Sequence, residues 1–443
     1  MNSRKYTKPI LALFLLHMLS LVMLDKITAF APDEKTYLKI FRGLYKSDFL
    51  LPNDSGWSLG SENVLRLLYL PAKIFNSLGI SDLYSIRLQA VGYSLSAALM
   101  LYSMASNASF FGLSSRKWIT IGLLIPSVFL WSTLGLRENL IFFFLVGAYF
   151  TISNFLKTNS MRYLASLIFV LIGLYSTKGY LFIILFFSVA ASVIILFFKT
   201  NKDRKKYVII AASFLIPLVI LPAATKTNFD LGRFFTSAII DFTEQTKPIS
   251  IVDFESTGQN TQGLYLQIED NPPLFFLVSK LGLYGGIKKA SEKVAMNSQE
   301  QKSESRNTKI NFESAKLNNP SSVVIGSLRF IFAPIPFVDS GNYFINFLSY
   351  ESPVWYIFYL LLFLIVGKLI FCRYEMSISL LSVVLCSVIF LVVSALIEVN
   401  TGTSIRHRSV LLFLILIAIA NVNEFSDKHE HEFDESIRRR DYN

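Results

Sequence analysis

Charged residues and cysteines are scarce in this sequence. Asp, Glu, Lys and Arg make up 16% of its 443 residues, whereas ordinary soluble domains carry about a quarter. The two cysteines, Cys372 and Cys386, lie at the end of one predicted helix and inside the next, so the sequence predicts no disulfide framework. The P-loop pattern GxxxxGK followed by Ser or Thr is also absent, which leaves a nucleotide-driven pump without support. Hydrophobic residues are abundant instead and make up 53% of the chain, including 40 Phe.

Long apolar runs recur along the chain and predict an all-α polytopic membrane protein. A helix needs roughly 20 largely apolar residues to cross a bilayer. About ten runs fit this pattern, or ten to twelve if apolar pieces of the long loop also span, and ten spans place both chain ends on one side. The predicted spans are 8–24, 84–106, 118–134, 139–156, 163–177, 179–198, 207–224, 354–371, 377–397 and 409–422.

The distribution of charge predicts the orientation in the membrane. The formal net charge is +11, and the basic residues of the short loops cluster on one side of the predicted spans, as Lys and Arg do in cytoplasmic loops. We therefore expect a multi-pass protein of a bacterial inner membrane with both termini in the cytoplasm. The bilayer, and not nucleic acid, is the expected partner of the positive charge. The first apolar run follows Arg4, Lys5 and Lys8 without a small-residue cleavage site, which predicts a retained anchor.

The chain divides into four predicted parts. Residues 1–224 form a seven-span unit with a first outer loop, 25–82, whose two amphipathic segments fit helices on the membrane surface or plain connector helices. Residues 225–350 form a long periplasmic loop that is partly mobile because of its polar stretch, with flanking pieces that dock on or re-enter the membrane. Three spans follow in 351–422, and residues 423–443 are a charged cytoplasmic tail.

Charged residues gather at the predicted outer ends of the spans. Charges are costly in hydrocarbon and mark function when they occur at depth, and here they share one side of the membrane. Each residue also has a structural explanation as an alternative to a functional one. Asp33, Glu34 and Glu138 could simply stand at helix N-termini, where acidic side chains are favoured. Arg406 and Arg408 likewise suit anchors at the lipid interface. The full set is Asp33, Glu34, Arg87, Arg137, Glu138, Lys178, Arg329, Arg406, His407 and Arg408.

Two acids and several cations on one face suit sugar-phosphate chemistry. Moving a sugar from a lipid phosphate to a hydroxyl group requires a carboxylate that takes the proton and positive charge on the departing phosphate. Arginine binds phosphate through two parallel hydrogen bonds and stays charged. A divalent cation such as Mg or Mn, held by carboxylates that include Asp33, is an alternative source of the positive charge.

The order of these features resembles the N-terminal half of GT-C glycosyltransferases of the protein-mannosyltransferase and lipid A aminoarabinose-transferase type. The resemblance covers about residues 8–200. It rests on PDEKTY after the first span, LYLPAKIFNSLGISDLYSIRL before the second, STLGLRENL before the fourth and YLASLIFVLIGLYSTKGYLFIIL around the sixth. The family's acidic pair with a downstream Tyr, its Arg, its second acidic position and its Lys map here to Asp33, Glu34, Tyr37, Arg87, Glu138 and Lys178.

The resemblance implies an integral membrane glycosyltransferase of cell-surface polysaccharide assembly. Such an enzyme takes a sugar or oligosaccharide from an undecaprenyl phosphate or diphosphate carrier at the periplasmic face and passes it to a glycan or lipid-linked acceptor, alongside other polysaccharide-assembly proteins. Asp33 is then the base or metal ligand, with Glu34 and Glu138 in support. The candidate substrate- and phosphate-binding residues are Tyr37, Arg87, Arg137, Lys178, Arg329, Arg406, His407 and Arg408.

Some features depart from that family and keep other functions open. The family's second acid is usually Asp, whereas this chain has Glu138 beside Arg137, and no large outer domain follows the last span. The second half, with RFIFAPIPF and RHR, resembles O-antigen and capsule membrane proteins such as Wzy-type polymerases, which rely on outer-face arginines. A repeat-unit polymerase is therefore the alternative function. A lipid-sugar flippase or transporter fits less well because no internal repeat is evident, and a scaffold without chemistry is the last option.

Overall fold

A computed structural model of the chain describes part of its length. The described residues are 4–25, 34, 38, 74–105, 108–199, 204–217, 320–333, 343–371, 377–397 and 401–422. Most of the predicted first outer loop, residues 225–319 and 334–342 of the predicted long loop, and the predicted C-terminal tail lie outside these ranges.

The described chain consists of α-helices and one short hairpin. Every predicted span overlaps a helix, which confirms the all-α fold class. The hairpin pairs β1 (Ser109–Phe110) with β2 (Leu113–Ser114) between two helices. The helices are α1 (Arg4–Asp25), α4 (Asp82–Met104), α5 (Ser115–Leu123), α6 (Pro126–Thr133), α7 (Glu138–Thr158), α8 (Met161–Thr177), α9 (Gly179–Lys199), α10 (Arg204–Ser213), α16 (Pro320–Phe332), α17 (Tyr343–Phe371), α18 (Ile378–Ile397) and α19 (Thr401–Asn421).

The protein is embedded in a membrane. Within the described residues, five helices are long and apolar enough to cross a bilayer, and the remaining predicted spans are shorter, broken or less apolar there. Helix α1 shows how such a helix faces its surroundings, because Leu15, Leu19 and Met23 are 57%, 57% and 68% exposed. Apolar side chains exposed along one face of a helix fit contact with lipid. The five helices span Thr7–Leu24, Glu138–Thr158, Gly179–Phe198, Ser349–Ile370 and Ile378–Ala395.

The predicted span 118–134 is not one helix. It is split into α5 and α6, which meet at Leu124 and Ile125. Pro126 explains the break, because proline has no N–H to donate and its ring clashes with the carbonyl four residues earlier. Proline suits the first position of a helix, and α6 begins with it. The break places the free N–H groups of a helix start inside the bundle.

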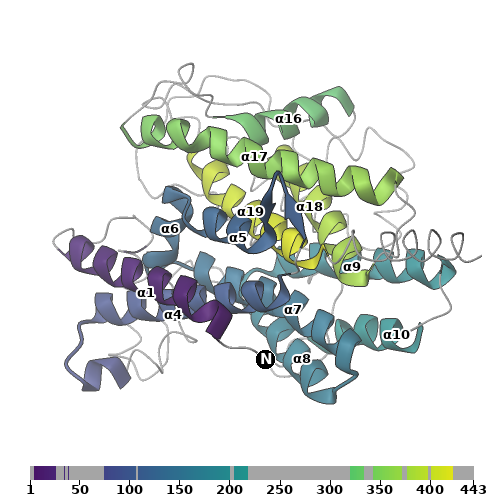
Figure 1. Cartoon of the computed structure of the whole chain (residues 1–443), viewed down its shortest axis with the longest axis horizontal. Coiled ribbons are helices and arrows are strands. Elements are labelled where there is room, and N and C mark those ends of the chain that lie inside the picture. The colour runs from purple at the N-terminus through teal and green to yellow at the C-terminus, as the bar shows by residue number, and fades with distance from the viewer. Residues whose placement is uncertain are drawn as a thin grey trace, which may run out of the picture.

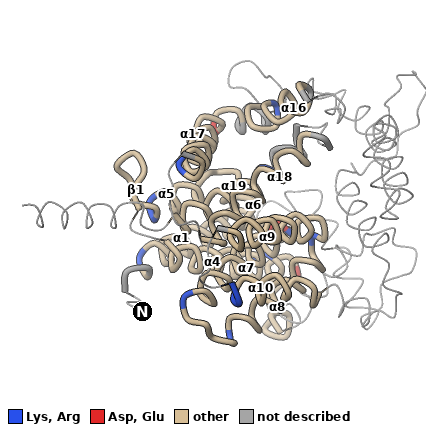
Figure 2. The backbone as a smooth tube through the Cα atoms, turned by 90° about the vertical axis from the view of Figure 1, so that its right-hand side faces the viewer, with Lys and Arg blue, Asp and Glu red and all other residues tan. Residues whose placement is uncertain are grey.

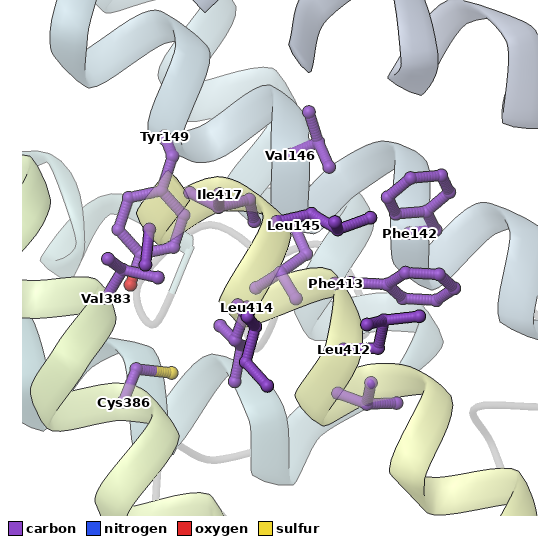
Figure 3. Close-up of a cluster of buried hydrophobic side chains, with 14 of the residues drawn as sticks. Phe142, Leu145, Val146, Tyr149, Val383, Cys386, Leu412, Phe413, Leu414 and Ile417 are labelled. Atoms are coloured by element: carbon purple, nitrogen blue, oxygen red, sulfur yellow. The ribbon is translucent and has the colours of Figure 1, made fainter. Parts of the chain in front are cut away.

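Helix α19 runs through the centre of the fold, between α16 and α17 above and α1, α4 and α8 below (Figure 1). The Phe413 ring stacks on Phe142 of α7 with the ring centroids 3.9 Å apart (Figure 3). Farther along both helices, the Ser153 hydroxyl donates a 2.8 Å hydrogen bond to the side-chain oxygen of Asn421. Helices α7 and α19 are therefore parallel, and the bundle has one end where both begin and one where both finish.

Glycines allow α8 to pack closely on α7. Gly173 of α8 lies against the Phe144 ring, and Gly147 of α7 lies against Val170, so the two helices run antiparallel. A methyl group at position 173 would overlap Phe144, whereas one at Gly92 of α4 would meet nothing within 4 Å. The small residue is thus required at the first position and not at the second.

Replacing Gly173 with Ala is expected to destabilise the protein by about 1–3 kcal/mol, the usual effect of overpacking a tight core. The matched Gly92→Ala variant should be stabilised by about 0.5–1 kcal/mol, because alanine favours the helix. The free energy of unfolding in detergent micelles, titrated with sodium dodecyl sulfate, measures both. Equal effects at the two positions would contradict the packing of α7 on α8.

Candidate functional site

Buried charge is rare in this bundle and coincides with the residues singled out from the sequence. The described backbone carries few Lys, Arg, Asp or Glu residues (Figure 2). Among the described residues, every buried Lys, Arg, Asp or Glu except Glu351 belongs to the predicted site. These residues are Glu34, Arg87, Arg137, Glu138, Lys178, Glu351 and Arg408, and the predicted His407 is buried with them.

Glu34 and Arg87 form a fully buried ion pair. Arg87 donates from Nε to one carboxylate oxygen at 2.7 Å and from Nη2 to the other at 2.8 Å, and the two side chains are 0% and 1% exposed. The third nitrogen, Nη1, donates to the carbonyl of Leu24 at 3.3 Å, and the backbone N–H of Gly135 donates to Glu34 at 3.2 Å. This fork geometry is the strongest form of the Arg–carboxylate pair. It ties Glu34 to α1, α4 and the turn before α7.

The turn from α6 to α7 brings two more charges into the interior. Gly135 fits against Ile86 of α4 so closely that a Cβ there would overlap it. Arg137 and Glu138 follow and are 4% and 3% exposed. Asn139 holds the turn by donating to the carbonyls of three preceding residues, among them Leu134 at 3.0 Å. Glu138 is the first residue of α7, where the helix dipole favours a negative charge.

Lys178 comes to the same level from the turn between α8 and α9. Phe144 lies beside Gly173 in the antiparallel pair. Asn139 lies five residues before Phe144, and Lys178 lies five residues after Gly173. Because α7 and α8 are antiparallel, Asn139 and its neighbour Glu138 lie at the same height along the helix axes as Lys178. Lys178 is 1% exposed, and its ammonium group lies 5.2 Å from the centroid of the Tyr180 ring. The structure thus brings a predicted acid and a predicted cation to one level of the bundle.

Arg408 lies near the same end of the bundle as Glu138. Glu138 precedes Phe142 by four residues and Arg408 precedes Phe413 by five, so they lie about 6 Å and 7.5 Å from the stacked rings along parallel helices. We call this the charged end. Glu138 and Arg408 therefore both lie near the end of the bundle where α7 and α19 begin.

A second polar cluster, which we call the Glu351 cluster, surrounds the start of α6. The Ser127 backbone N–H donates to Glu351 at 2.9 Å, its hydroxyl donates to the other carboxylate oxygen, and the Trp355 indole donates to that same oxygen at 3.0 Å. Glu351 therefore caps the helix start that the break at Pro126 exposes. Gly135 follows the other end of α6, whose part from Ser127 to Thr133 is about 9 Å long.

Arg408 is connected to this second cluster. Its Nε donates to the Phe330 carbonyl of α16 at 2.6 Å, and the guanidinium lies 6.0 Å from the Phe330 ring centroid. It is within electrostatic range of Glu351 and of Tyr359. The buried charges of the described residues therefore lie in two clusters. Glu34, Arg87 and the start of α7 form one, and Arg408 and Glu351 belong to the other.

Several predicted residues are not placed with these clusters. Asp33, Tyr37 and the Arg406 side chain lie outside the described residues, so their roles stay predictions. Arg329 is described and is exposed on α16. Within the described ranges, no three His, Cys, Asp or Glu side chains gather in a way that suits a metal ion.

Glu351, Ser127 and Tyr359 were missed by the sequence analysis. Glu351 stands just before the predicted span 354–371 and was not among the predicted site residues. One signal was present, because Glu351, Trp355 and Tyr359 repeat every four residues and so lie on one helix face.

A search of known protein families and of curated proteins finds no match to this chain.

Proposed function

We propose that the chain is an integral membrane glycosyltransferase that takes a sugar or oligosaccharide from an undecaprenyl phosphate or diphosphate carrier. The observation that carries this proposal is the concentration of buried Arg, Lys and Glu side chains at one end of an otherwise apolar bundle. Buried charge in a membrane protein is costly and marks sites of function. Acids and cations together at the end of membrane-spanning helices suit a substrate with a lipid tail, a phosphate and a sugar.

Within this proposal the charges have separate roles. Both oxygens of Glu34 accept hydrogen bonds from Arg87, so we assign Glu34 to holding Arg87 and the Gly135 turn. Asp33, the residue before it, takes the acceptor proton or holds a divalent cation such as Mg or Mn. Glu138 supports from the start of α7, and the cations stabilise the departing phosphate.

The proposal includes the membrane arrangement. We assign ten spans with both termini in the cytoplasm of a bacterium, which puts the charged end at the periplasmic face. The acceptor is a glycan or a lipid-linked sugar of cell-surface polysaccharide. This arrangement follows from the Lys and Arg of the short loops.

A strain without the chain tests the function. We expect it to lack one sugar or one polymer of its surface polysaccharide and to accumulate the undecaprenyl-linked precursor, and we expect the intact chain to restore the product. Mass spectrometry of the lipid-linked and surface glycans measures both pools. Unchanged glycans in a strain that normally produces the protein would refute the proposal.

A repeat-unit polymerase of the Wzy type is the second candidate, and Arg408 favours it. Its guanidinium is buried at the charged end, and no carboxylate among the described residues pairs with it. In a polymerase the arginines are essential and Asp33 is dispensable. The same deletion strain separates the two candidates, because a missing polymerase leaves single repeat units on the surface whereas a missing transferase leaves shortened or unmodified units.

A further inference from the structure

Two buried donors in the Glu351 cluster lack hydrogen-bond partners among the described residues. They are Nη2 of Arg408 and the hydroxyl of Tyr359, whose residues are 2% and 3% exposed. The two groups are within electrostatic range of each other. A buried donor without a partner costs free energy, and a buried cation without a counterion costs more. Two such donors within electrostatic range of each other suggest that an acceptor arrives from outside the chain.

The neighbouring carboxylate does not fill this role. Glu351 already accepts from the Ser127 N–H, the Ser127 hydroxyl and the Trp355 indole. Among the described residues Glu351 forms no ion pair with Arg408, whereas Glu34 pairs with Arg87. Arg87 is neutralised by that pair, whereas Arg408 uses Nε for the uncharged carbonyl of Phe330.

The position of the site within the apolar part of the bundle limits the class of ligand that can reach it. Tyr359 lies inside the apolar stretch Ser349–Ile370, and Arg408 is the second residue of the apolar helix segment His407–Asn421, so the site lies within the apolar part of the bundle near its charged end. A water-soluble anion would lose most of its hydration at such a depth. An anion carried by a lipid is already concentrated in the membrane and needs only to slide its headgroup between helices. A phosphate also matches the planar guanidinium, which donates two parallel hydrogen bonds to it.

We propose that Arg408 and Tyr359 bind the phosphate group of a membrane-dissolved polyprenyl lipid between α16, α17 and α19. The site is separate from the Glu34–Arg87 pair, and Glu351 holds its wall by fixing the start of α6 against α17. This inference rests on the proposed function only for the identity of the lipid as the sugar carrier. Binding of the phosphate itself is independent of any transfer reaction.

Direct binding tests the site. The full chain is reconstituted in nanodiscs of phosphatidylcholine, and the Kd for radiolabelled undecaprenyl phosphate is measured with undecaprenol and inorganic phosphate as competitors. We expect undecaprenyl phosphate to bind and undecaprenol to compete poorly. Inorganic phosphate should compete poorly as well, and strong competition by it that depends on Arg408 would overturn the lipid source and assign the site to a soluble phosphate.

The variants remove one donor at a time. Arg408→Gln should raise the Kd by about 10- to 100-fold and Tyr359→Phe by about tenfold, because each removes a hydrogen bond to a charged group. Arg162→Gln and Tyr350→Phe, which change exposed residues, are the matched controls and should stay within twofold of the parent chain. Tyr359→Phe removes a single oxygen and so remains informative if Arg408→Gln does not accumulate.

Parent-like affinity in Tyr359→Phe together with parent-like affinity in Arg408→Gln would overturn the site. If Arg408→Gln does not accumulate, parent-like affinity in Tyr359→Phe alone overturns it. Failure of the proposed function looks different. A chain that binds undecaprenyl phosphate through Arg408 while the deletion strain keeps all its glycans would refute the transferase and leave the phosphate site intact.

Discussion

Asp33→Asn is expected to lower the rate of sugar transfer by about 10²- to 10⁴-fold, the usual contribution of a general base. Asparagine keeps the size and the polarity of the side chain but cannot take a proton. Asp33 directly precedes Glu34, whose carboxylate is held by Arg87 and by the Gly135 N–H at the charged end. The initial transfer rate of the purified chain in liposomes, with a defined polyprenyl-linked donor, measures the effect.

The control is another acid at the same end of the bundle. Asp82, at the first position of α4, accepts a 2.7 Å hydrogen bond from Asn76 and has no role in the proposed chemistry. Asp82→Asn should change the rate less than twofold. A rate near that of the parent chain in Asp33→Asn would remove Asp33 as the base, and a loss of activity in Glu138→Gln in that case would move the role to Glu138.

The helices could be predicted because each carries its own signal. A run of roughly 20 apolar residues is sufficient to form a helix in a membrane, since every backbone group is then bonded within the run. For this reason the predicted spans 139–156 and 179–198 match α7 and α9 closely. The break before Pro126 was visible in the sequence too, but a hydropathy average over the whole run 118–134 conceals it.

The pairings within the site could not be predicted. The partner of Glu34 is Arg87, 53 residues away, and nothing in the local sequence marks Glu34 for a buried ion pair. The sequence analysis therefore gave both acids catalytic candidacy. Glu351 and Ser127 are 224 residues apart and meet only because α17 packs on the break between α5 and α6. Such contacts depend on the arrangement of the helices, which local periodicity does not encode.

Breaking the Glu34–Arg87 pair should have the largest effect on stability. Arg87→Met alone leaves a buried carboxylate without its cation, and Glu34→Met alone leaves a buried cation, so each is expected to cost about 3–5 kcal/mol. The double variant removes both charges and replaces them with flexible apolar side chains. It should therefore cost far less than the two single changes together, with a coupling energy of at least about 2 kcal/mol. Unfolding in micelles titrated with sodium dodecyl sulfate gives all four free energies.

The roles of Asp33 and Glu34 can be distinguished by combining this double-mutant cycle with the activity measurements. Glu34→Met should lose stability, and the activity of its folded fraction should fall much less than that of Asp33→Asn, if Glu34 only positions its surroundings. Asp33→Asn should keep the stability of the parent chain and lose its activity. The Asn76–Asp82 bond at the start of α4 is the matched pair for the cycle, because a part-buried pair near the surface is expected to couple by less than about 1 kcal/mol. A coupling between Glu34 and Arg87 as small as that of Asn76 and Asp82 would show that the buried pair does not hold the charged end together, and Glu34 would again be a candidate for the chemistry.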